Sequence, residues 1–404
     1  MWLALHGASS AFQPTRQEGA VVVKAPLHGR EPLHTVARTI DQLAPQLPLA
    51  LVGPAASSRL RLAADSLPAA LTSWIYLECR LRRDAQQVDL IVRVDQRGRD
   101  ILSGDNPVIE LDSALQRHPV WRGVRALARG WSDPSSTLHR GVERIWLEFD
   151  LHEADITRMT SALPAPGVFI EFTREVYAQH SRENRASVAL AALRAFMPDG
   201  MAPAMLRYLR RCWELLPSGT AIPYVGVFPA RGSSAVRVCI AGLGDADLPG
   251  YLRALRWPGS YRDLLRAIAA FLPPVHVPRP RMAIINLDVV QELDTRVGIE
   301  YVLSHAAQLR GSILEKEFLD HLVRSGSCTA AKCDALLGWP ATSLQSMPHE
   351  LWRSRASRRV NHLKLAYADG ELPEVKAYLS ASHEFRPARL SSERASIRLQ
   401  PSTR

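Results

Sequence analysis

The sequence has no run of about 18 or more apolar residues, the length that a membrane-spanning helix requires, so a membrane span is excluded. The opening stretch MWLALHGASSAF is short and lacks the basic flank of a secretory signal. Cysteine is scarce, at 5 residues in a chain of 404, and an odd number does not suit a disulfide scaffold. We therefore expect a cytoplasmic protein with no membrane partner.

Short catalytic and cofactor-binding motifs are also absent. The sequence contains no HExxH, no CxxC pair, no GxxxxGK[ST], no GxSxG and no aspartate-rich DDxxD segment. Gly242 and Gly244 stand in GLGDADLPG, which breaks the dinucleotide-binding fingerprint. No metal site or resident cofactor is therefore expected, and any function has to be inferred from architecture.

Positive charge is concentrated at one end of the chain. The net charge is +10, and most of it falls within residues 351–404. A basic patch on an expected short helix, Pro340–Arg359, comprises Arg353, Arg355, Arg358 and Arg359 beside Trp352. Such a patch could bind nucleic acid or an acidic partner through its charge. No recognised nucleic-acid-reading module accompanies it, so nucleic acid is an unlikely partner and this function is the second alternative.

Five segments alternate strictly between apolar and polar residues on both sides of a turn, as β-hairpins do. The expected hairpins are Trp74–Arg82 with Val88–Asp95, Arg144–Asp150 with Val168–Thr173, Tyr224–Ala230 with Val236–Ala241, Met282–Val289 with Val297–Val302, and Val360–Tyr367 with Glu374–Leu379. Their midpoints recur at intervals of about 60 to 78 residues, which indicates an internal repeat.

The stretches between the hairpins carry apolar residues at helical spacing. The expected helices are Glu31–Leu47, Ile109–Trp131, Arg185–Leu216, Leu248–Phe271 and Ala306–Leu337. We therefore predict an α+β fold, a ten-stranded antiparallel β-barrel of five hairpins surrounded by helices. The expected division is an N-terminal extension over residues 1–30, the barrel domain over 31–381 and a basic, disordered tail over 382–404.

Alternation also assigns the faces of the strands. Ile75, Leu77 and Cys79 form the apolar face that should meet the helices, so Tyr76 and Glu78 point into the barrel. The expected inward side chains include Arg80, Asp89, Ile91, Arg93, Arg144, Trp146, Glu148, Phe169, Glu171, Tyr224, Arg237, Cys239, Asn286, Asp288, Glu300, His362, Lys364, Lys376 and Tyr378. Because buried charge is costly unless paired, this lining predicts a wet ligand chamber. The alternative is a sandwich in which these residues form the outer, solvated faces.

Two short segments carry a resemblance to a known family. WIYLEC places Glu78 on the first strand, and VKAYL places Lys376 and Tyr378 on one face of the last strand, opposite Lys364. With five hairpins over residues 30 to 380, the chain resembles the αββα-barrel (ABBA) prenyltransferases, which include indole and cyanobactin peptide types. The resemblance implies that catalytic Glu78 orients the acceptor. It also implies a diphosphate site made by Arg93, Arg237, Lys364, Lys376 and Tyr378.

The implied chemistry accounts for these residue types. Fixed cations stabilise the diphosphate leaving group, and aromatic faces stabilise an allyl cation and exclude water. Tyr76, Trp146, Tyr224 and Phe228 are the expected aromatic shield and acceptor pocket. The expected function is transfer of an allylic group from a prenyl diphosphate co-substrate to an aromatic or peptide acceptor in specialised metabolism. Magnesium is not expected to be required, because side chains would neutralise the diphosphate.

The inward carboxylates support another interpretation. Six of them, Glu78, Asp89, Glu148, Glu171, Asp288 and Glu300, would repel a diphosphate. The first alternative is therefore the same barrel without prenyl transfer, an acid–base enzyme that modifies or cyclises a peptide or small molecule. His362 beside Lys364 could take part in it. A pentein, the five-fold barrel of guanidine-modifying enzymes, fits poorly because the last cysteine, Cys333, falls on an expected helix.

Overall fold

The computed structural model describes residues 35–82, 87–107, 109, 111–151, 165–178, 182–197, 200–274, 277, 280–303, 308, 313–346 and 352–387. Its strands are β1 (Trp74–Arg80), β2 (Val88–Val94), β3 (Val142–Phe149), β4 (Gly167–Phe172), β5 (Ala221–Val227), β6 (Val236–Ala241), β7 (Arg281–Val289), β8 (Leu293–Val302), β9 (Ala341–Ser346), β10 (Trp352–Tyr367) and β11 (Glu374–Pro387). The five predicted hairpins coincide with the strand pairs β1–β2, β3–β4, β5–β6, β7–β8 and β10–β11.

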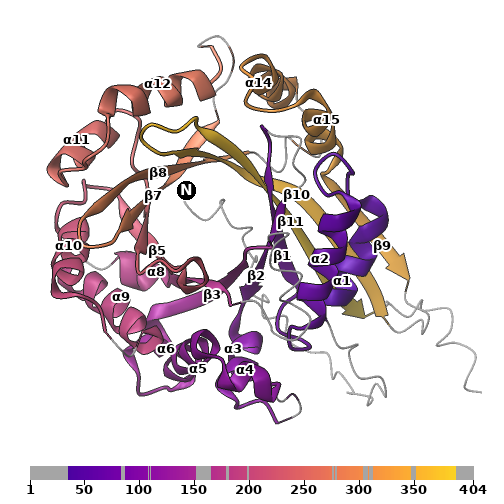
Figure 1. Ribbon diagram of the computed structural model, residues 1–404. Helices are drawn as coiled ribbons and strands as arrows, with labels where there is room; N and C mark the ends of the chain where they lie inside the picture. Colours follow the sequence, from indigo (N-terminus) through magenta and orange to yellow (C-terminus); the bar gives the residue numbers. More distant parts are fainter. Residues whose placement is uncertain are drawn as a thin grey trace, which may run out of the picture.

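The strands form one antiparallel sheet that closes on itself. Each strand from β1 to β7 pairs with the next in sequence, β8 pairs with β10, and β11 pairs with both β10 and β1. The ten strands other than β9 therefore form a closed barrel, seen end-on in Figure 1. The predicted fold class is confirmed by these pairings. The expected extension over residues 1–30 lies outside the described residues.

The helices surround the barrel on its outer side (Figure 1). They are α1 (Val36–Leu43), η2 (Ala44–Gln46), α2 (Pro54–Asp65), α3 (Gln96–Ser103), α4 (Ser113–Arg117), α5 (Pro119–Ser132), α6 (Thr137–Gly141), α8 (Arg174–Ala178), α9 (Arg182–Phe196), α10 (Pro203–Glu214), η3 (Pro229–Arg231), α11 (Leu248–Ala254), α12 (Tyr261–Phe271), α14 (Ile313–Arg324) and α15 (Ala330–Gly338). Within the described residues, none of the helices has the length and apolar character needed to cross a membrane.

Four expected long helices are each divided into two, at residues that stop a helix. Pro119 and Pro203 begin α5 and α10, where a proline ring fits because the first helical N–H needs no partner. Gly326, between α14 and α15, has a φ of +71°, a left-handed conformation that side chains other than glycine rarely adopt. The breaks let consecutive helices follow the curved surface of the barrel.

The two faces of each strand belong to different cores. Ile75, Leu77 and Cys79 are fully buried between the barrel and the helices, in one continuous apolar cluster. A second, smaller cluster lies on the inner face of the barrel, and Tyr76 and Trp146 belong to it. The polar, inward face predicted from alternation is thus confirmed for β1, and the alternative of a two-sheet sandwich is wrong because the sheet closes.

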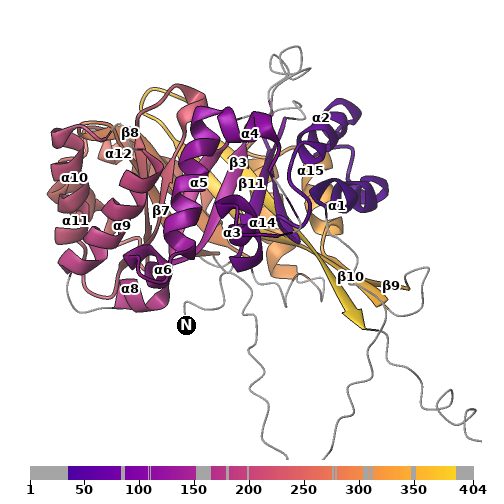
Figure 2. The same cartoon turned by 90° about the horizontal axis from the view of Figure 1, so that it is seen from below.

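Two predictions near the C-terminus need correction. Ala341–Ser346 forms β9, which pairs with Arg353–Arg358 of β10, so the expected helix Pro340–Arg359 is wrong. This segment has few apolar residues, and pairing with a neighbouring strand decides its structure. The end of β11 also continues beyond the expected domain boundary, as far as Pro387. Figure 2 shows β9 and the adjoining end of β10 extending away from the ring of helices. The tail beyond Pro387 lies outside the described residues.

A pair of substitutions tests the assignment of faces. Leu77→Ala should lower the free energy of unfolding by about 2–5 kcal/mol, because it leaves a cavity in a closely packed core. Ile91→Ala should cost clearly less, because this side chain already borders a cavity in the lumen. Denaturant-induced unfolding measures both. Equal losses for the two variants would contradict the assignment.

Candidate functional site

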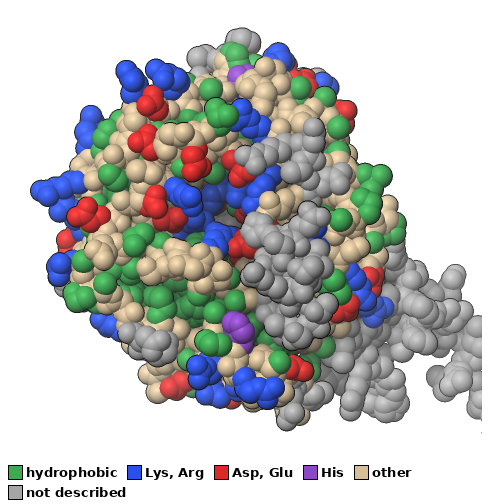
Figure 3. Space-filling model, viewed as in Figure 1, with side chains coloured by type: hydrophobic (Ala, Val, Ile, Leu, Met, Phe, Trp, Pro, Cys, Tyr) green, Lys and Arg blue, Asp and Glu red, His purple; other side chains and the backbone are tan. Residues whose placement is uncertain are grey.

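The lumen contains two adjoining chambers. The aromatic chamber is a cavity of about 90 Å³ that Tyr76, Trp146, Phe169, Tyr224 and Ile284 help to line. The polar chamber is a cavity of about 270 Å³. Its charged lining residues are Glu78, Glu148, Arg231, Arg237, Asp288, Arg296, Lys364, Glu371, Glu374 and Lys376. In Figure 3, viewed as in Figure 1, Lys and Arg side chains gather around a hollow in the middle of the molecule.

The two chambers adjoin each other, because four side chains line both of them. These are Glu148, Asn286, Lys364 and Tyr378. The arrangement offers separate environments within a single lumen.

The aromatic chamber is built from rings on neighbouring strands. Tyr76 and Trp146 meet edge to face, with ring centroids 5.2 Å apart, a favourable geometry for aromatic pairs. The Trp146 indole N–H donates a hydrogen bond of 3.0 Å to Glu171, whose other carboxylate oxygen accepts from Arg144 at 3.0 Å. These bonds fix the orientation of the Trp146 ring in the chamber wall.

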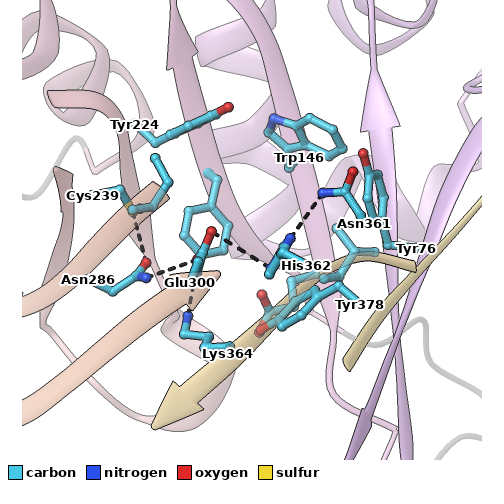
Figure 4. A pocket seen from close by; sticks show the side chains of 14 residues that line it. Tyr76, Trp146, Tyr224, Cys239, Asn286, Glu300, Asn361, His362, Lys364 and Tyr378 are labelled. Carbon is cyan, nitrogen blue, oxygen red and sulfur yellow. Dashed lines mark hydrogen bonds and ion pairs between the residues drawn. The ribbon is translucent and has the colours of Figure 1, made fainter. Parts of the chain in front are cut away.

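A hydrogen-bonded group of polar side chains lies opposite these rings (Figure 4). Asn286 donates to Glu300 at 2.9 Å and accepts from the Cys239 thiol at 3.2 Å. Lys364 lies 3.5 Å and His362 lies 3.7 Å from the same Glu300 carboxylate. Burial lowers the pKa of His362, although the Glu300 charge opposes this effect. The group presents a neutral imidazole and an ionic pair to the chamber.

Glu78 lies where the barrel closes, between β1 and β11. Its carboxylate accepts a hydrogen bond from the Lys376 ammonium at 2.6 Å and a short one from the Tyr378 hydroxyl. Burial disfavours the charged form of Glu78, but Lys376 and Tyr378 outweigh burial and hold the pKa of Glu78 well below its usual range. Glu78 is therefore an ionised hydrogen-bond acceptor held in one orientation.

The arginines of the polar chamber are held by carboxylates. Arg237 forms two hydrogen bonds with Asp288, at 2.7 and 2.8 Å. Arg231 binds Asp150 at 2.6 Å and makes a shorter contact with Glu148. Burial opposes the charge of these arginines, yet the carboxylates raise the pKa of both. Cations that are already paired and oriented need little rearrangement to meet an anion.

Some inward carboxylates resist ionisation. Burial raises the pKa of Glu148 even though Arg231 opposes it, and the Glu78 charge adds to the effect. The pKa of Asp89 is raised by burial and by Glu78 in the same way. Glu148 lines both chambers, so a proton on Glu148 would make the polar chamber more positive where it meets the aromatic one.

Most of the predicted site residues meet around the two chambers. Glu78, Arg237, Lys364, Lys376 and Tyr378 line the polar chamber, and Tyr76, Trp146 and Tyr224 line the aromatic one. Phe228 lies beside Phe169 with ring centroids 5.3 Å apart, and the guanidinium of Arg237 lies 4.5 Å from its centroid.

Arg93 does not join the other predicted diphosphate ligands. It pairs in register with Trp146, and its neighbour Val92 pairs with Ile75 near the start of β1. Glu78 lies four residues after Trp74, which corresponds to about 13 Å along a strand. Arg93 therefore lies toward the other end of the lumen from Lys376.

Sequence reasoning did not place two residues, Arg231 and Asn361, in the lumen. Arg231 lies in the turn between β5 and β6, where alternation gives no information. A register shift between Val360 and His362 places Asn361 in the aromatic chamber beside His362. The same shift reverses the alternation in the part of β10 before Asn361. Val360 therefore packs in the apolar cluster between the barrel and the helices, and the Arg359 guanidinium donates a hydrogen bond to the Ser380 hydroxyl. Among the described residues, no group of three His, Cys, Asp or Glu side chains has a geometry that could hold a metal ion.

The titration of Glu171 gives a testable property of the site. Burial raises the pKa of Glu171 to about 6 from 4.5, although Arg144 and the Trp146 N–H oppose the shift. The folded state therefore binds more protons between these values, and stability falls as the pH rises through this window, by about 2 kcal/mol in total. Glu171→Gln should flatten that slope, measured as unfolding free energy against pH. Glu143→Gln, at an exposed partner of Arg144, is the control, and an unchanged slope in Glu171→Gln would contradict the assignment.

Comparison with known proteins finds a likeness in solved structures alone. No protein-family model matches the chain, and no curated protein matches it. The structure of PriB with product diphosphate has 16% identity and a TM-score of 0.48, covering 88% of this chain and 99% of that one. The 5-dimethylallyltryptophan synthase of Streptomyces coelicolor has 15% identity and a TM-score of 0.43, covering 90% and 99%. AnaPT of Neosartorya fischeri has 10% identity and a TM-score of 0.43, covering 85% and 91%. At these values the function has to be argued from the site itself.

Proposed function

We propose that this barrel transfers an allylic prenyl group from a diphosphate to an aromatic or peptide acceptor, as an enzyme of specialised metabolism. The observation that carries the proposal is that a chamber lined by charged side chains, with arginines and lysines among them, adjoins an aromatic chamber. A prenyl diphosphate has the same two parts, an anionic head and a short apolar chain.

The polar chamber supplies what a diphosphate leaving group requires. Arg237 offers a planar fork that matches phosphate oxygens, and Lys364 and Lys376 act as point charges. The carboxylates that hold these cations would oppose a bound anion. Proton uptake by Glu148, whose pKa is already raised, would relieve that repulsion. In this proposal the side chains neutralise the diphosphate without a metal ion.

Glu78 has the properties of an orienting group for the acceptor. It lines the polar chamber next to Tyr378, which lines both chambers. Because its pKa is lowered, it accepts a hydrogen bond and stabilises positive charge that develops on the acceptor, and it is a weak base for complete proton removal. The rings of Tyr76, Trp146 and Tyr224 would shield the allyl cation from water.

A second candidate function rests on the different titration of the inward carboxylates. The pKa of Glu78 is lowered and that of Glu148 is raised, although both line the polar chamber. Such a pair suits an acid–base enzyme that modifies a peptide or small molecule without a diphosphate. Nucleic-acid binding has no such support: Arg358 stacks on Trp339 and Arg359 on Trp74, so they form no free patch.

Binding of the donor separates the two candidates. Dimethylallyl, geranyl and farnesyl diphosphate should each be titrated in a thermal-shift assay, with and without magnesium. A ligand at a hundred times its Kd stabilises the folded state by about 2.7 kcal/mol, which gives a measurable rise in Tm. We expect a rise that is independent of magnesium and largest for one chain length.

The same assay tests the predicted head-group ligands. Lys376→Ala should weaken diphosphate binding at least tenfold, because it removes a cation of the polar chamber. Lys316→Ala, at an exposed lysine paired with Asp320 on α14, should leave the affinity unchanged. If well-folded wild-type protein shows no shift with any diphosphate, prenyl transfer is rejected in favour of the acid–base function.

Substitution of Glu78 should separate binding from turnover. Glu78→Gln removes the charge that pairs with Lys376, so diphosphate should bind at least as tightly as before. Prenylation of an aromatic acceptor panel, followed by mass spectrometry, should fall by about 10²–10⁴-fold. Unchanged turnover in this variant would show that Glu78 has no part in the reaction.

A further inference from the structure

A positively charged surface lies outside the barrel, where α10 and α11 meet. Tyr251 of α11 donates a hydrogen bond of 2.8 Å to the Cys212 carbonyl of α10, and the Arg211 guanidinium donates one of 2.7 Å to the Ala254 carbonyl of α11. The two helices therefore lie side by side, at the left of Figure 1. We call the five arginines of this surface the outer arginine patch: Arg207, Arg210, Arg211, Arg253 and Arg256.

The patch faces solvent. Arg207 and Arg210 are both exposed and lie three residues apart on α10, which corresponds to about 4.5 Å along a helix. Arg253, near the end of α11, and Arg256, just beyond it, are exposed in the same way. Figure 3 shows Lys and Arg side chains projecting from this left side of the molecule. Several guanidinium groups can therefore meet one ligand that lies across the two helices.

The patch has little counter-charge. On the next helix, α12, Arg266 pairs with Asp263 at 2.9 Å, whereas the four exposed arginines of the patch form no ion pair with a carboxylate among the described residues. Glu214 ends α10, and Glu292 lies near enough to Tyr208 to act on it, so positive charge predominates without being the only charge. A surface of this kind attracts anionic ligands, over a distance that salt limits.

Capping of the helix end does not account for these side chains. Basic residues often occupy the last turn of a helix, where they bind carbonyl groups that have no partner within the helix. At the end of α11 the Arg211 guanidinium and the Tyr208 hydroxyl already bind two of these carbonyls. Arg253 and Arg256 are not needed for that purpose, and their guanidinium groups point to a ligand outside the chain.

Arg256 is also held in a strained backbone conformation. Its φ is +56°, in the left-handed region, at the position after a helix where glycine is the usual residue. The N–H of Trp257 donates to the Leu252 carbonyl at 3.0 Å, so the turn itself requires this conformation. A side chain other than glycine is strained there, and strained positions concentrate at functional sites. The arginine is therefore expected to serve something other than the turn.

The surroundings of the patch favour an acidic polypeptide over other polyanions. Surfaces that bind single-stranded nucleic acid add aromatic rings on which bases stack, but here Tyr251 and Trp257 are buried and the Tyr208 hydroxyl is bound to the backbone. Surfaces that bind membranes add exposed apolar side chains, and neither α10 nor α11, both fully described, exposes a large one. Arginine matches a carboxylate with a two-pronged geometry.

We infer that the outer arginine patch binds an acidic segment of a partner polypeptide, a stretch rich in Asp and Glu. The patch lies on the outer side of the helices, so the inference goes beyond the proposed function and does not depend on it. A segment docked here would hold its protein beside the barrel and raise the local concentration of whatever that protein carries.

A model acidic peptide tests the inference on the full chain. A fluorescein-labelled oligoglutamate peptide is titrated and its fluorescence anisotropy is measured, with an oligoglutamine peptide of equal length as the uncharged comparison. We expect the acidic peptide alone to bind, and its affinity to fall as salt is added, because salt screens contacts between exposed charges. If folded protein binds neither peptide, or binds both equally, the inference is overturned.

Two double variants separate a local site from the general positive charge of the protein. Arg207→Glu with Arg210→Glu reverses two charges of the patch and should weaken oligoglutamate binding at least tenfold. Arg117→Glu with Arg122→Glu, at exposed residues of α4 and α5, changes the net charge by the same amount and should leave the affinity within about twofold. Equal weakening in both double variants overturns the inference, because net charge alone then explains binding.

Arg256→Gly should separate binding from folding. Glycine relieves the left-handed strain, so Tm should be retained or raised while oligoglutamate binding weakens, and Arg256→Lys should keep most of the affinity. A lower Tm with unchanged binding in Arg256→Gly counts against the inference, since the arginine then serves the turn. A DNA duplex that binds more tightly than oligoglutamate, through the same α10 arginines, overturns it in favour of nucleic acid. Affinity for dimethylallyl diphosphate should be the same in the α10 double variant as in the wild type, so failure of this inference and failure of the proposed function are distinguishable.

Discussion

The structure depends on closure of the sheet at β11, which pairs with β10 on one side and β1 on the other. Closure removes the edges of the ten barrel strands, and it leaves every alternate side chain in a confined lumen. The link from Glu78 to Lys376 and Tyr378 crosses the same seam. The contact that orients the proposed catalytic carboxylate is therefore also a contact across the joint of the barrel.

Much of this architecture could be predicted because apolar residues alternate in strands and repeat at helical spacing. Ile75, Leu77 and Cys79 on one face and Tyr76 and Glu78 on the other needed no knowledge of the remaining chain. The prediction failed where the alternation of apolar and polar residues along a strand is interrupted. The register shift at Asn361 reverses the faces of β10 and brings Arg359 to Ser380. A single additional residue in one strand is enough to move a charge from one side of a sheet to the other.

Pairing of charges was harder to predict than their position. Glu78 and Lys376 are separated by 298 residues in the chain, so no local pattern shows that they neutralise each other. Inward carboxylates seemed to conflict with diphosphate binding because their partners were unknown. The structure gives several of them a cation, including Asp288 with Arg237 and Glu171 with Arg144. The question is therefore how the charges balance when a diphosphate binds. The cation of a buried ion pair is already out of water, so an anion that joins the pair does not have to desolvate that cation.

The arginines at the two ends of the lumen also differ in how far carboxylates neutralise them. At one end, carboxylates raise the pKa of Arg237; at the other, burial lowers the pKa of Arg93 without a carboxylate to oppose it fully. Asp95 and Glu171 oppose this shift only in part, so the arginines at the two ends of the lumen differ in how completely they are neutralised. In the proposed function, a diphosphate held at Arg237 and Lys376 would place its apolar chain toward Tyr76, Trp146 and Tyr224, beside the acceptor. Catalysis by proximity would then follow from the distribution of charge along the barrel, since fixing both reactants replaces a bimolecular encounter with a unimolecular step.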